Sequence, residues 1–245
     1  MPAAKMIHRF LLPGVTACLC VCGVGAAAQA PVAHWTMDAI VNGVVPDASG
    51  RGHHARCGSR TAPEPAPGVI GGALRFRPEG EYFLQIERWE ELTRPGGLTV
   101  MAWVRPEARN QQTEILCGKS DRAGAPPWPG WRLRFFWTRA CFEYGTADGK
   151  EQRVLSPEWS VPAGFWSHVA ATLDAARARV YVNAVEAASL PVEAPMLPPR
   201  VPLILGNFVG RKNAYAFNGC IDEVKVFDCA LSAEEVFAAA TRGMD

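Results

Sequence analysis

The chain contains the stretch Phe217-Asn-Gly-Cys-Ile-Asp-Glu-Val-Lys-Val-Phe227, which is preceded by Val180-Tyr-Val-Asn183 and followed by Ala230-Leu-Ser-Ala-Glu-Glu-Val236. The first two segments alternate apolar and polar residues with a period of two, as half-buried β-strands do. In the third, Glu235 stands three residues after Ser232, which is the spacing of a capping box. Together the segments predict strands followed by a short helix over residues 232–240.

The rest of the chain shows the same short, strand-like runs. The clearest is Leu98-Thr-Val-Met-Ala-Trp-Val104, which ends at Arg105-Pro106 because proline cannot donate a ladder hydrogen bond. Residues 62–68 are rich in proline and are predicted to lack regular structure. Roughly a dozen short strands separated by turns indicate an all-β protein with two antiparallel sheets. The other predicted strands cover residues 32–37, 73–76, 82–86, 114–118, 131–138, 140–144, 168–173 and 202–205.

The order of these segments resembles that of LamG-like (laminin G domain-like, concanavalin A-like) jelly-roll domains. The resemblance implies an all-β, two-sheet antiparallel jelly-roll sandwich with a short C-terminal helix. That fold usually displays a carbohydrate- or protein-binding surface and only sometimes an active site. The matching features are His34-Trp-Thr-Met-Asp38, Asp47-Ala-Ser-Gly-Arg-Gly-His-His54, Gly71-Gly-Ala-Leu-Arg-Phe76, Leu98-Thr-Val-Met-Ala-Trp-Val-Arg-Pro106, Ile115-Leu-Cys-Gly-Lys119, Gly164-Phe-Trp-Ser-His-Val-Ala170 and the closing segments.

One residue departs from the family pattern. Members usually place glycine after the asparagine at position 183, whereas this chain has Ala184. Asn-Gly is the favoured two-residue hairpin turn because both positions need a positive φ. Alanine there implies either a longer loop or a strained residue.

Residues 1–28 are predicted to be a signal peptide, which leaves residues 29–245 as the LamG-like domain. Lys5 and Arg9 form a charged start, an apolar run follows, and Ala26-Ala-Ala28 supplies small residues for cleavage. The run is too short and interrupted to form a stable membrane span. We therefore expect a secreted, periplasmic or cell-surface protein.

A lipid anchor is the alternative to simple secretion. Val15-Thr-Ala-Cys18 is similar to a bacterial lipobox, which would make Cys18 the lipidated first residue of a lipoprotein. In both interpretations the protein leaves the cytoplasm.

The charge balance argues against nucleic acid and anionic membranes as partners. The chain has 25 basic and 24 acidic residues, and loss of Lys5 and Arg9 leaves 23 basic residues against the same 24 acidic ones. Binding to polyanions needs clustered lysines and arginines, which the sequence lacks.

Five cysteines remain outside the targeting segment, enough for two disulfides and one spare thiol in an oxidising compartment. Cys117 and Cys141 end or begin neighbouring strand-like runs and are the first predicted pair. Buried free thiols are the alternative, because a large core does not need covalent links. The five are Cys57, Cys117, Cys141, Cys220 and Cys229.

The resemblance also implies a structural Ca²⁺ at the edge of the sandwich. The corresponding ligands would be Asp38 and Asp222, with a backbone carbonyl from the Gly52-His53-His54 turn. These oxygens suit a hard cation. The alternative is that the carboxylates face water or accept backbone N–H groups. Asp47, which precedes Ala-Ser-Gly, is expected to cap a turn.

No catalytic residues are predicted. Glycoside hydrolases on this sandwich carry a Glu-x-Asp-x-x-Glu strand that supplies a nucleophile and an acid, and the sequence contains no such run. Glu87, Glu90 and Glu91 do not alternate along a strand, and Glu79 and Glu81 lie in a loop marked by proline and glycine. We therefore expect the protein not to be an enzyme.

A ligand-binding surface is predicted around the segment Trp128-Pro-Gly-Trp131 and the strand that it enters. On that strand, one face carries Trp131, Leu133, Phe135 and Trp137, which we assign to the core. The opposite face carries Arg132, Arg134 and Phe136, which we then expect to be exposed. An aromatic ring between guanidinium groups can stack on sugar rings and bond hydroxyls or carboxylates.

The predicted ligand-binding residues are therefore Trp128, Arg132, Arg134 and Phe136. A loop tryptophan folded back onto the sandwich, and a merely solvated strand face, are the structural alternatives. The predicted function is a secreted, non-catalytic module that recognises an extracellular glycan or a cell-surface protein. The alternatives are a polysaccharide hydrolase or lyase on the same scaffold, and a structural adhesion module.

Overall fold

The computed structural model describes residues 29–59, 61–92, 96–107, 112–118, 129–208 and 215–244. The predicted signal peptide, Cys18 and Trp128 lie outside these ranges. Within them, no helix has the length and apolar character needed to cross a membrane.

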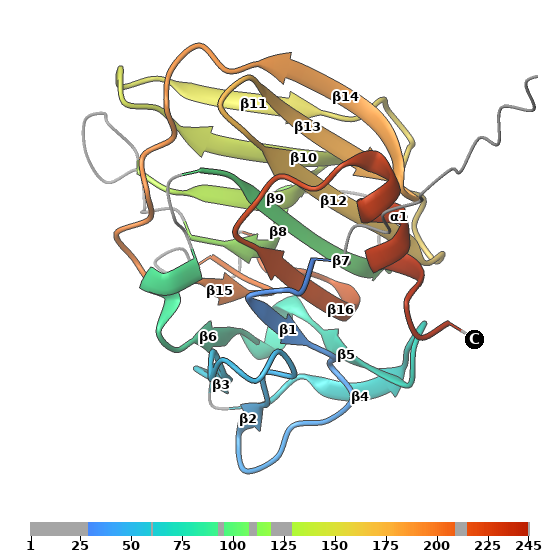
Figure 1. The fold of residues 1–245 in the computed structure, drawn as a ribbon. Helices are drawn as coiled ribbons and strands as arrows, with labels where there is room; N and C mark the ends of the chain where they lie inside the picture. Colours follow the sequence, from blue (N-terminus) through green and yellow to red (C-terminus); the bar gives the residue numbers. More distant parts are fainter. Residues whose placement is uncertain are drawn as a thin grey trace, which may run out of the picture.

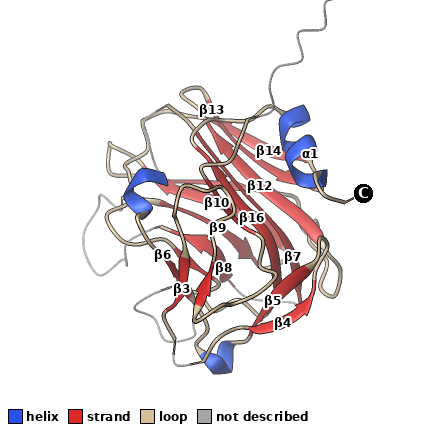
Figure 2. Cartoon of the chain, turned by 60° about the horizontal axis from the view of Figure 1, so that its bottom comes forward, coloured by secondary structure: helices blue, strands red, loops and turns tan. Residues whose placement is uncertain are grey.

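Two eight-stranded antiparallel sheets pack face to face (Figures 1 and 2). In the first, named here the β7 sheet, the order is β14-β13-β12-β7-β16-β5-β4, and β1 pairs with β16. Its strands are β1 (Ala33–Trp35), β4 (Glu64–Pro67), β5 (Gly72–Phe76), β7 (Leu98–Pro106), β12 (Ser167–Leu173), β13 (Arg177–Val182), β14 (Val185–Pro191) and β16 (Gly219–Phe227).

The second sheet, named here the β9 sheet, has the order β11-β10-β9-β8-β15-β6-β3-β2. Short 3-10 turns at Pro78–Gly80 (η1) and Trp89–Leu92 (η2) connect strands of the two sheets. Its strands are β2 (Val44–Val45), β3 (Ala55–Cys57), β6 (Leu84–Ile86), β8 (Gln112–Cys117), β9 (Trp131–Phe136), β10 (Arg139–Gly145), β11 (Glu151–Leu155) and β15 (Ile204–Leu205).

The core lies between the two sheets. Alternate side chains of each strand point inward, because the side-chain period of a strand is two. Aromatic rings such as those of Trp35, Phe76, Trp131 and Phe142 are fully buried there. This arrangement confirms the predicted two-sheet antiparallel jelly-roll sandwich.

The short helix α1 (Ala233–Thr241) covers part of the outer face of the β7 sheet, where Val236 joins a second apolar cluster with Met101 and Tyr181 (Figure 1). Ser232 and Glu235 form the predicted capping box at its start. At its end, the indole N–H of Trp103 donates to the Ala240 carbonyl at 3.1 Å. The helix also contacts β16, where Lys225 donates to the Ala239 carbonyl at 3.0 Å, and every residue of that strand is buried.

Two details differ from expectation. The proline-rich segment is not wholly irregular, because Glu64–Pro67 forms strand β4 at the sheet edge, where proline is tolerated. Cys141 is a buried free thiol, so the disulfide predicted for it with Cys117 is wrong. Burial raises the pKa of the Cys141 thiol to about 11.

The Asn183-Ala184 pair forms a two-residue turn between β13 and β14. Its φ angles are 49° and 62°. Of the two readings of Ala184, the strained residue is therefore correct and the longer loop is wrong.

Candidate functional site

The arginines that we expected on an exposed strand face are buried. Arg132 is 5% exposed and Arg134 is 1% exposed, so that expectation is wrong. Both lie against Glu143, a fully buried residue of the neighbouring strand β10: Arg132 forms an ion pair with it, and the Arg134 Nε lies 4.0 Å from its Oε2. The negative charge of a buried carboxylate must be compensated, and guanidinium groups on the neighbouring strand supply the opposite charge.

Phe136 is half-buried on the same face. The guanidinium carbons of Arg134 and Arg153 lie 5.3 and 5.2 Å from the centre of its ring. The structure thus brings together three of the four predicted ligand residues, but as a packed charge cluster. Whether they touch a ligand stays a prediction, and Trp128 lies outside the described residues.

Three exposed aromatic side chains gather elsewhere, apart from Phe237 on α1. Trp137, Trp159 and Phe165 are 58%, 63% and 68% exposed, which is unusual for such large apolar groups. All three line one cleft of about 210 Å³, named here the aromatic cleft. Its lining residues are Pro106, Thr113, Phe135, Trp137, Thr138, Trp159, Val161, Pro162, Ala163, Phe165, Phe217 and Asn218.

The aromatic cleft opens at one end of the sandwich. Strands β7 and β9 end there, at Pro106 and Phe136, and β12 and β16 begin there, at Ser167 and Gly219. The cleft therefore draws its residues from both sheets. Side chains at strand ends and loops are the usual place for ligand contacts on a sandwich, because the rigid sheets position them.

A loop over residues 156–165 forms one wall of the cleft and is fixed to the β9–β10 turn. The backbone N–H of Trp159 donates to the hydroxyl of Thr138 at 3.0 Å, and the N–H of Val161 donates to the Thr138 carbonyl at 3.2 Å. Farther along, the N–H of Gly164 donates to the Pro106 carbonyl at 2.7 Å. These bonds hold Trp137 and Trp159 on adjoining parts of the rim.

Both tryptophans have a left-handed backbone. Trp137 and Trp159 each have a φ of 63°. For a bulky residue this conformation costs roughly 1–2 kcal/mol, and hairpin turns normally place glycine or asparagine there. The strained backbone and the exposed aromatic side chain each lower the stability of the fold. The presence of both at two residues of one cleft therefore points to function.

Few of the described residues in the cleft are polar, and those few are uncharged. Thr113, Thr138 and Asn218 are the polar side chains among the described lining residues. Neither the Thr113 hydroxyl nor the Asn218 carboxamide makes a hydrogen bond within the described part of the chain. These residues can stack on a ring and hydrogen-bond hydroxyls.

A second cleft, of about 420 Å³, lies at the opposite end of the sandwich, where β12 ends. Its described lining residues are mainly aliphatic, with Asp174 and Glu193 among them, and none of them is aromatic. Asp174 is occupied there, because Oδ2 accepts from Arg179 at 2.9 Å and Oδ1 accepts from the N–H of Ala176 and of Arg177. This cleft is therefore the weaker candidate for recognising a sugar.

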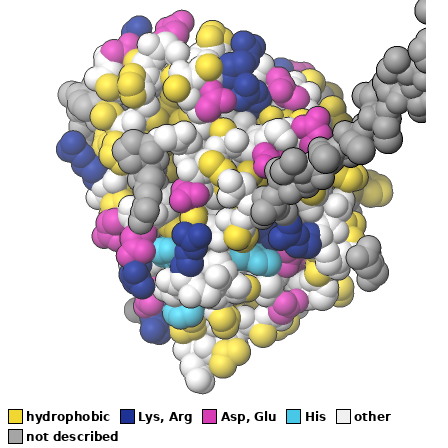
Figure 3. All heavy atoms as spheres, viewed as in Figure 1, with side chains coloured by type: hydrophobic (Ala, Val, Ile, Leu, Met, Phe, Trp, Pro, Cys, Tyr) yellow, Lys and Arg dark blue, Asp and Glu magenta, His cyan; other side chains and the backbone are white. Residues whose placement is uncertain are grey.

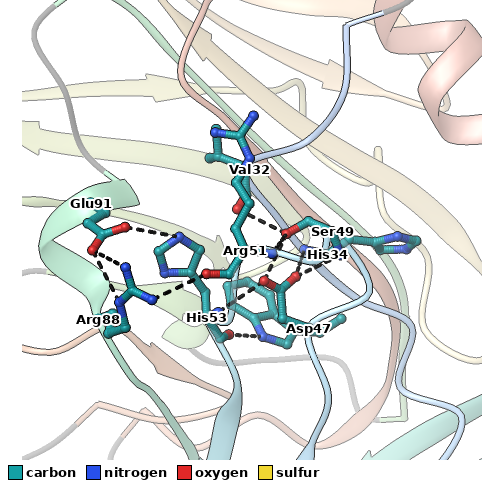
Figure 4. A network of polar contacts seen from close by, with 9 residues as sticks. Val32, His34, Asp47, Ser49, Arg51, His53, Arg88 and Glu91 are labelled. Atoms are coloured by element: carbon teal, nitrogen blue, oxygen red, sulfur yellow. Dashed lines mark hydrogen bonds and ion pairs between the residues drawn. The ribbon is translucent and has the colours of Figure 1, made fainter.

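Asp47 caps its turn as predicted (Figure 4). Its Oδ1 accepts the N–H of His34 and of Ser49, both at 2.9 Å. Its Oδ2 accepts the N–H of His53 at 3.0 Å and the Ser49 hydroxyl at 2.8 Å. Although burial raises the pKa of Asp47, these hydrogen bonds hold it below its ordinary value. The network fixes the loop and leaves no carboxylate oxygen free for a ligand.

The predicted calcium ligands Asp38 and Asp222 both contact the β4–β5 turn. Asp38 Oδ1 accepts the N–H of Gly72 at 2.6 Å, and Asp222 Oδ2 accepts the N–H groups of Val69 and Ile70 at 2.7 and 3.1 Å. Burial raises the pKa of Asp222 to about 6, against the lowering effect of those amides.

Of the three carbonyls in the Gly52-His53-His54 turn, His53 O accepts the Trp35 indole N–H at 2.7 Å, and His54 O accepts the N–H of Glu87 at 3.0 Å. Within the described ranges, no group of three or more His, Cys, Asp or Glu side chains could hold a metal ion. One atom fits a cation: Asp222 Oδ1 is buried and has no hydrogen-bond partner among these residues. A Ca²⁺ here would therefore depend on two carboxylates and backbone oxygens, and its binding stays a prediction.

The visible surface has no region of single charge. On the face shown in Figure 3, acidic and basic side chains are interspersed, with apolar side chains scattered between them. Many of these charges are paired, as Arg75 is with Glu107 at 2.5 Å.

The sequence contained a partial signal for the aromatic cleft. Trp159 lies between Pro157 and Pro162, and Phe165 follows Pro162. The segment shows no strand alternation, so a loop position could have been inferred from the sequence. Trp137 was assigned to the core because the predicted strand ran to residue 138, but β9 ends at Phe136. That assignment is wrong, since the two-residue turn projects the indole outward.

Comparisons with known proteins agree with this architecture. A family model described as the concanavalin A-like lectin/glucanases superfamily, of laminin G type, matches residues 79–237. No curated protein matches the chain. Among solved structures, domain 4 of AbnA, an extracellular arabinanase from Geobacillus stearothermophilus in complex with arabinotriose, has a TM-score of 0.67 at 20% identity. That match covers 87% of this chain and all of the domain.

Two toxin domains are also similar in fold. The binding domain of Paraclostridial Mosquitocidal Protein 1 has a TM-score of 0.66 at 15% identity, over 84% of this chain. The ligand-binding domain of botulinum neurotoxin serotype D, in complex with N-acetylneuraminic acid, has a TM-score of 0.61 at 12% identity, over 87% of this chain. This chain spans 51% of each toxin domain. The three structures are domains of binding proteins or of a secreted enzyme, and at this identity they show the shared fold alone.

Proposed function

The chain belongs to the concanavalin A-like lectin/glucanase superfamily, and from this premise we propose that it is a secreted, non-catalytic module that binds an extracellular glycan at the aromatic cleft. One observation carries the proposal: Trp137 and Trp159 are exposed and strained on the rim of a single cleft. Indole rings bury large apolar area against a sugar face at little conformational cost, while hydroxyl and amide groups fix orientation.

The lack of catalytic groups in the cleft supports binding over hydrolysis. A glycosidase needs two carboxyl groups facing the scissile bond, and none of the described residues that line the aromatic cleft carries one. Of the carboxylates that the sequence analysis considered, Glu87 forms a surface ion pair with Arg56 and Glu91 with Arg88, and neither lines the cleft.

The glycan-bound relatives of the same fold add support of a coarser kind. One is complexed with arabinotriose, and another, of which this chain spans 51%, is complexed with N-acetylneuraminic acid, so proteins that contain this fold bind carbohydrate. The ligand of this chain is not inferred from theirs, because fold similarity alone does not transfer a binding site.

A structural Ca²⁺ at Asp38 and Asp222 is a separate part of the proposal. The buried Asp222 Oδ1 without a hydrogen-bond partner supports it, because a cation would compensate that oxygen. The ion would tie the β4–β5 turn to β16, away from the aromatic cleft, so it would affect stability more than glycan binding.

The test is a glycan and polysaccharide array probed with the mature protein, in Ca²⁺ and again in EDTA. We expect saturable binding that is lost in Trp137→Gly and in Trp159→Gly but kept in Ala184→Gly, a substitution at a residue that does not line the cleft. Binding that survives both tryptophan substitutions would place the site elsewhere. Retention of no glycan in either buffer would overturn the proposal and favour a cell-surface protein as the partner.

A further inference from the structure

Strand β14 carries two exposed large apolar side chains outside the aromatic cleft. Val185 and Leu190 are 68% and 38% exposed. Helix α1, which carries the exposed Phe237, contacts this strand. Single exposed apolar residues are common on protein surfaces, but two on one strand beside a third on its neighbour mark an interaction surface.

The backbone of β14 is also available for pairing. The strand has seven residues and is the last one of the β7 sheet, at the top of the view in Figure 1. It pairs with β13 along one side, and no described strand pairs with its other side. The N–H and C=O groups of an edge strand can bind a further extended strand.

The strands at the other three ends of the two sheets carry features that oppose such pairing. Strand β4 contains two prolines, and β2 has only two residues. Strand β11 carries the charged residues Glu151 and Arg153. Prolines, short strands and charges are the features by which proteins prevent edge-to-edge association. In β14, by contrast, proline occurs only at the last residue, and Glu186 is the single charged residue.

A second copy of the chain fits this edge. Two identical strands that pair antiparallel across a two-fold axis match in length and in exposed apolar side chains. If the axis passes near Ala188, the middle residue of β14, the two copies of Glu186 lie four residues apart. That separation is about 14 Å along the strands, longer than the Debye length at physiological salt. Parallel pairing in register would instead place the two carboxylates side by side.

We propose that the protein forms a two-fold symmetric dimer in which β14 pairs antiparallel with β14 of a second copy. The two β7 sheets then become one continuous sheet. Val185 and Leu190 of each copy lose exposed apolar surface at the contact, which favours association.

This dimer fixes the directions of the two aromatic clefts. The N–H of Asn183, in the turn before β14, donates to the His168 carbonyl at 2.8 Å, next to the start of β12 at the cleft end of the sandwich. Strand β14 therefore begins at the cleft end and runs away from it. Antiparallel pairing directs the two clefts toward opposite ends of the dimer. Resting on the proposed function, the dimer would join two separate glycan chains.

The test measures the mass of the mature protein in solution. Sedimentation velocity over a range of concentrations, with a reductant that prevents disulfides between copies, should show a species of twice the monomer mass. The double variant Val185→Lys and Leu190→Lys should remain a monomer, because lysine on an edge strand opposes pairing. Val41→Lys is the matched control: Val41 is 56% exposed and lies outside β14, so this variant should still dimerise. Thermal unfolding confirms that each variant folds.

Hydrogen exchange identifies the surface. Amides of β14 should exchange more slowly in the dimeric wild type than in the double variant, whereas those of β4 should not change. A wild-type protein that stays monomeric at every concentration would overturn the inference, as would a double variant that dimerises like the wild type.

The glycan array tests the proposed function separately. Dimerisation without binding to any glycan would support the β14 interface and overturn only glycan binding. Glycan binding by a protein that stays monomeric would do the reverse. If both hold, the wild type should precipitate a polysaccharide that it binds, and the double variant should bind the same polysaccharide without precipitating it.

Discussion

The backbone N–H of Trp159 donates a 3.0 Å hydrogen bond to the hydroxyl of Thr138, the residue next to Trp137. This bond joins the 156–165 loop to the β9–β10 turn. It brings two exposed indoles from distant parts of the sequence to the rim of one cleft. The relationship explains how two left-handed tryptophans persist, because the surrounding hydrogen bonds hold both turns in place.

The first prediction concerns strain at Trp137. In Trp137→Gly, we expect glycan binding to be lost and the free energy of unfolding to be unchanged or raised by up to about 1 kcal/mol, since glycine adopts a positive φ without strain. Ala184→Gly is the matched control, because it relieves a similar φ of 62° at a residue that does not line the cleft. Thermal unfolding and array binding of both variants provide the measurement. A marked loss of stability in Trp137→Gly would mean that the indole serves the fold.

The second prediction concerns Thr138. Replacing it with valine removes the acceptor for the Trp159 N–H at nearly constant volume. We expect a loss of about 0.5–1.5 kcal/mol in the free energy of unfolding and weaker glycan binding, because the loop that carries Trp159 is released. Thr138→Ser, which keeps the hydroxyl, should behave as the wild type. Urea unfolding and calorimetry test this; equal behaviour of the two variants would remove any role for the hydrogen bond.

The third prediction concerns the charge cluster on the outer face of the β9 sheet. Glu143 is fully buried and pairs with Arg132 and, at 3.0 Å, with Arg153. Glu143→Ala leaves buried guanidinium groups without their carboxylate, and we expect a loss of about 3–5 kcal/mol. Glu87→Ala, which removes only a surface pair with Arg56, should cost less than about 1 kcal/mol. Similar midpoints of urea unfolding for Glu143→Ala and Glu87→Ala would contradict the structural role of Glu143.

The fourth prediction concerns pH. Burial, followed by the charge of Lys225, lowers the pKa of His168 to about 3, whereas an unfolded histidine has a pKa near 6.5. Between pH 6.5 and about pH 3, this histidine is protonated only in the unfolded chain. The free energy of unfolding therefore decreases as the pH falls through this range, by roughly a few kcal/mol in total.

In His168→Phe, which keeps an aromatic ring beside Trp103, that part of the acid sensitivity should disappear. Urea unfolding between pH 7 and about pH 4 measures the difference. A pH profile identical to that of the wild type would show that other groups cause the acid sensitivity.

The fifth prediction concerns calcium. If Asp38 and Asp222 hold a Ca²⁺, excess calcium stabilises the folded state by mass action and should raise the unfolding temperature relative to EDTA. The shift should vanish in Asp38→Asn, whose amide oxygen can still accept the N–H of Gly72. Glycan binding through the aromatic cleft should persist in EDTA. An unfolding temperature independent of calcium would sink the predicted metal site.

Local patterns in the sequence determined the architecture. The period-two alternation predicted most of the strands because burial of one sheet face imposes it, and the Ser232–Glu235 spacing predicted the start of α1 because a capping box is a local interaction. Strands β2, β3, β4, β11 and β14 were missed. Four of them, β2, β4, β11 and β14, are edge strands, where one side is unpaired and the burial that imposes alternation is weaker. In addition, β4 contains two prolines, which an edge position tolerates, and β2 has only two residues.

Only the tertiary structure decided which polar and aromatic residues face the solvent. Alternation correctly separated the two faces of β9, but it could not reveal that Glu143 on the next strand draws Arg132 and Arg134 into a buried cluster. Nor could it place Trp137, because a strand end displaced by two residues moves that side chain from the core to the rim of a cleft. The sequence by itself determined the two-sheet sandwich, since that depends on patterns repeated along each strand. The aromatic cleft depends on hydrogen bonds between residues distant in the chain, and only the folded sandwich brings those together.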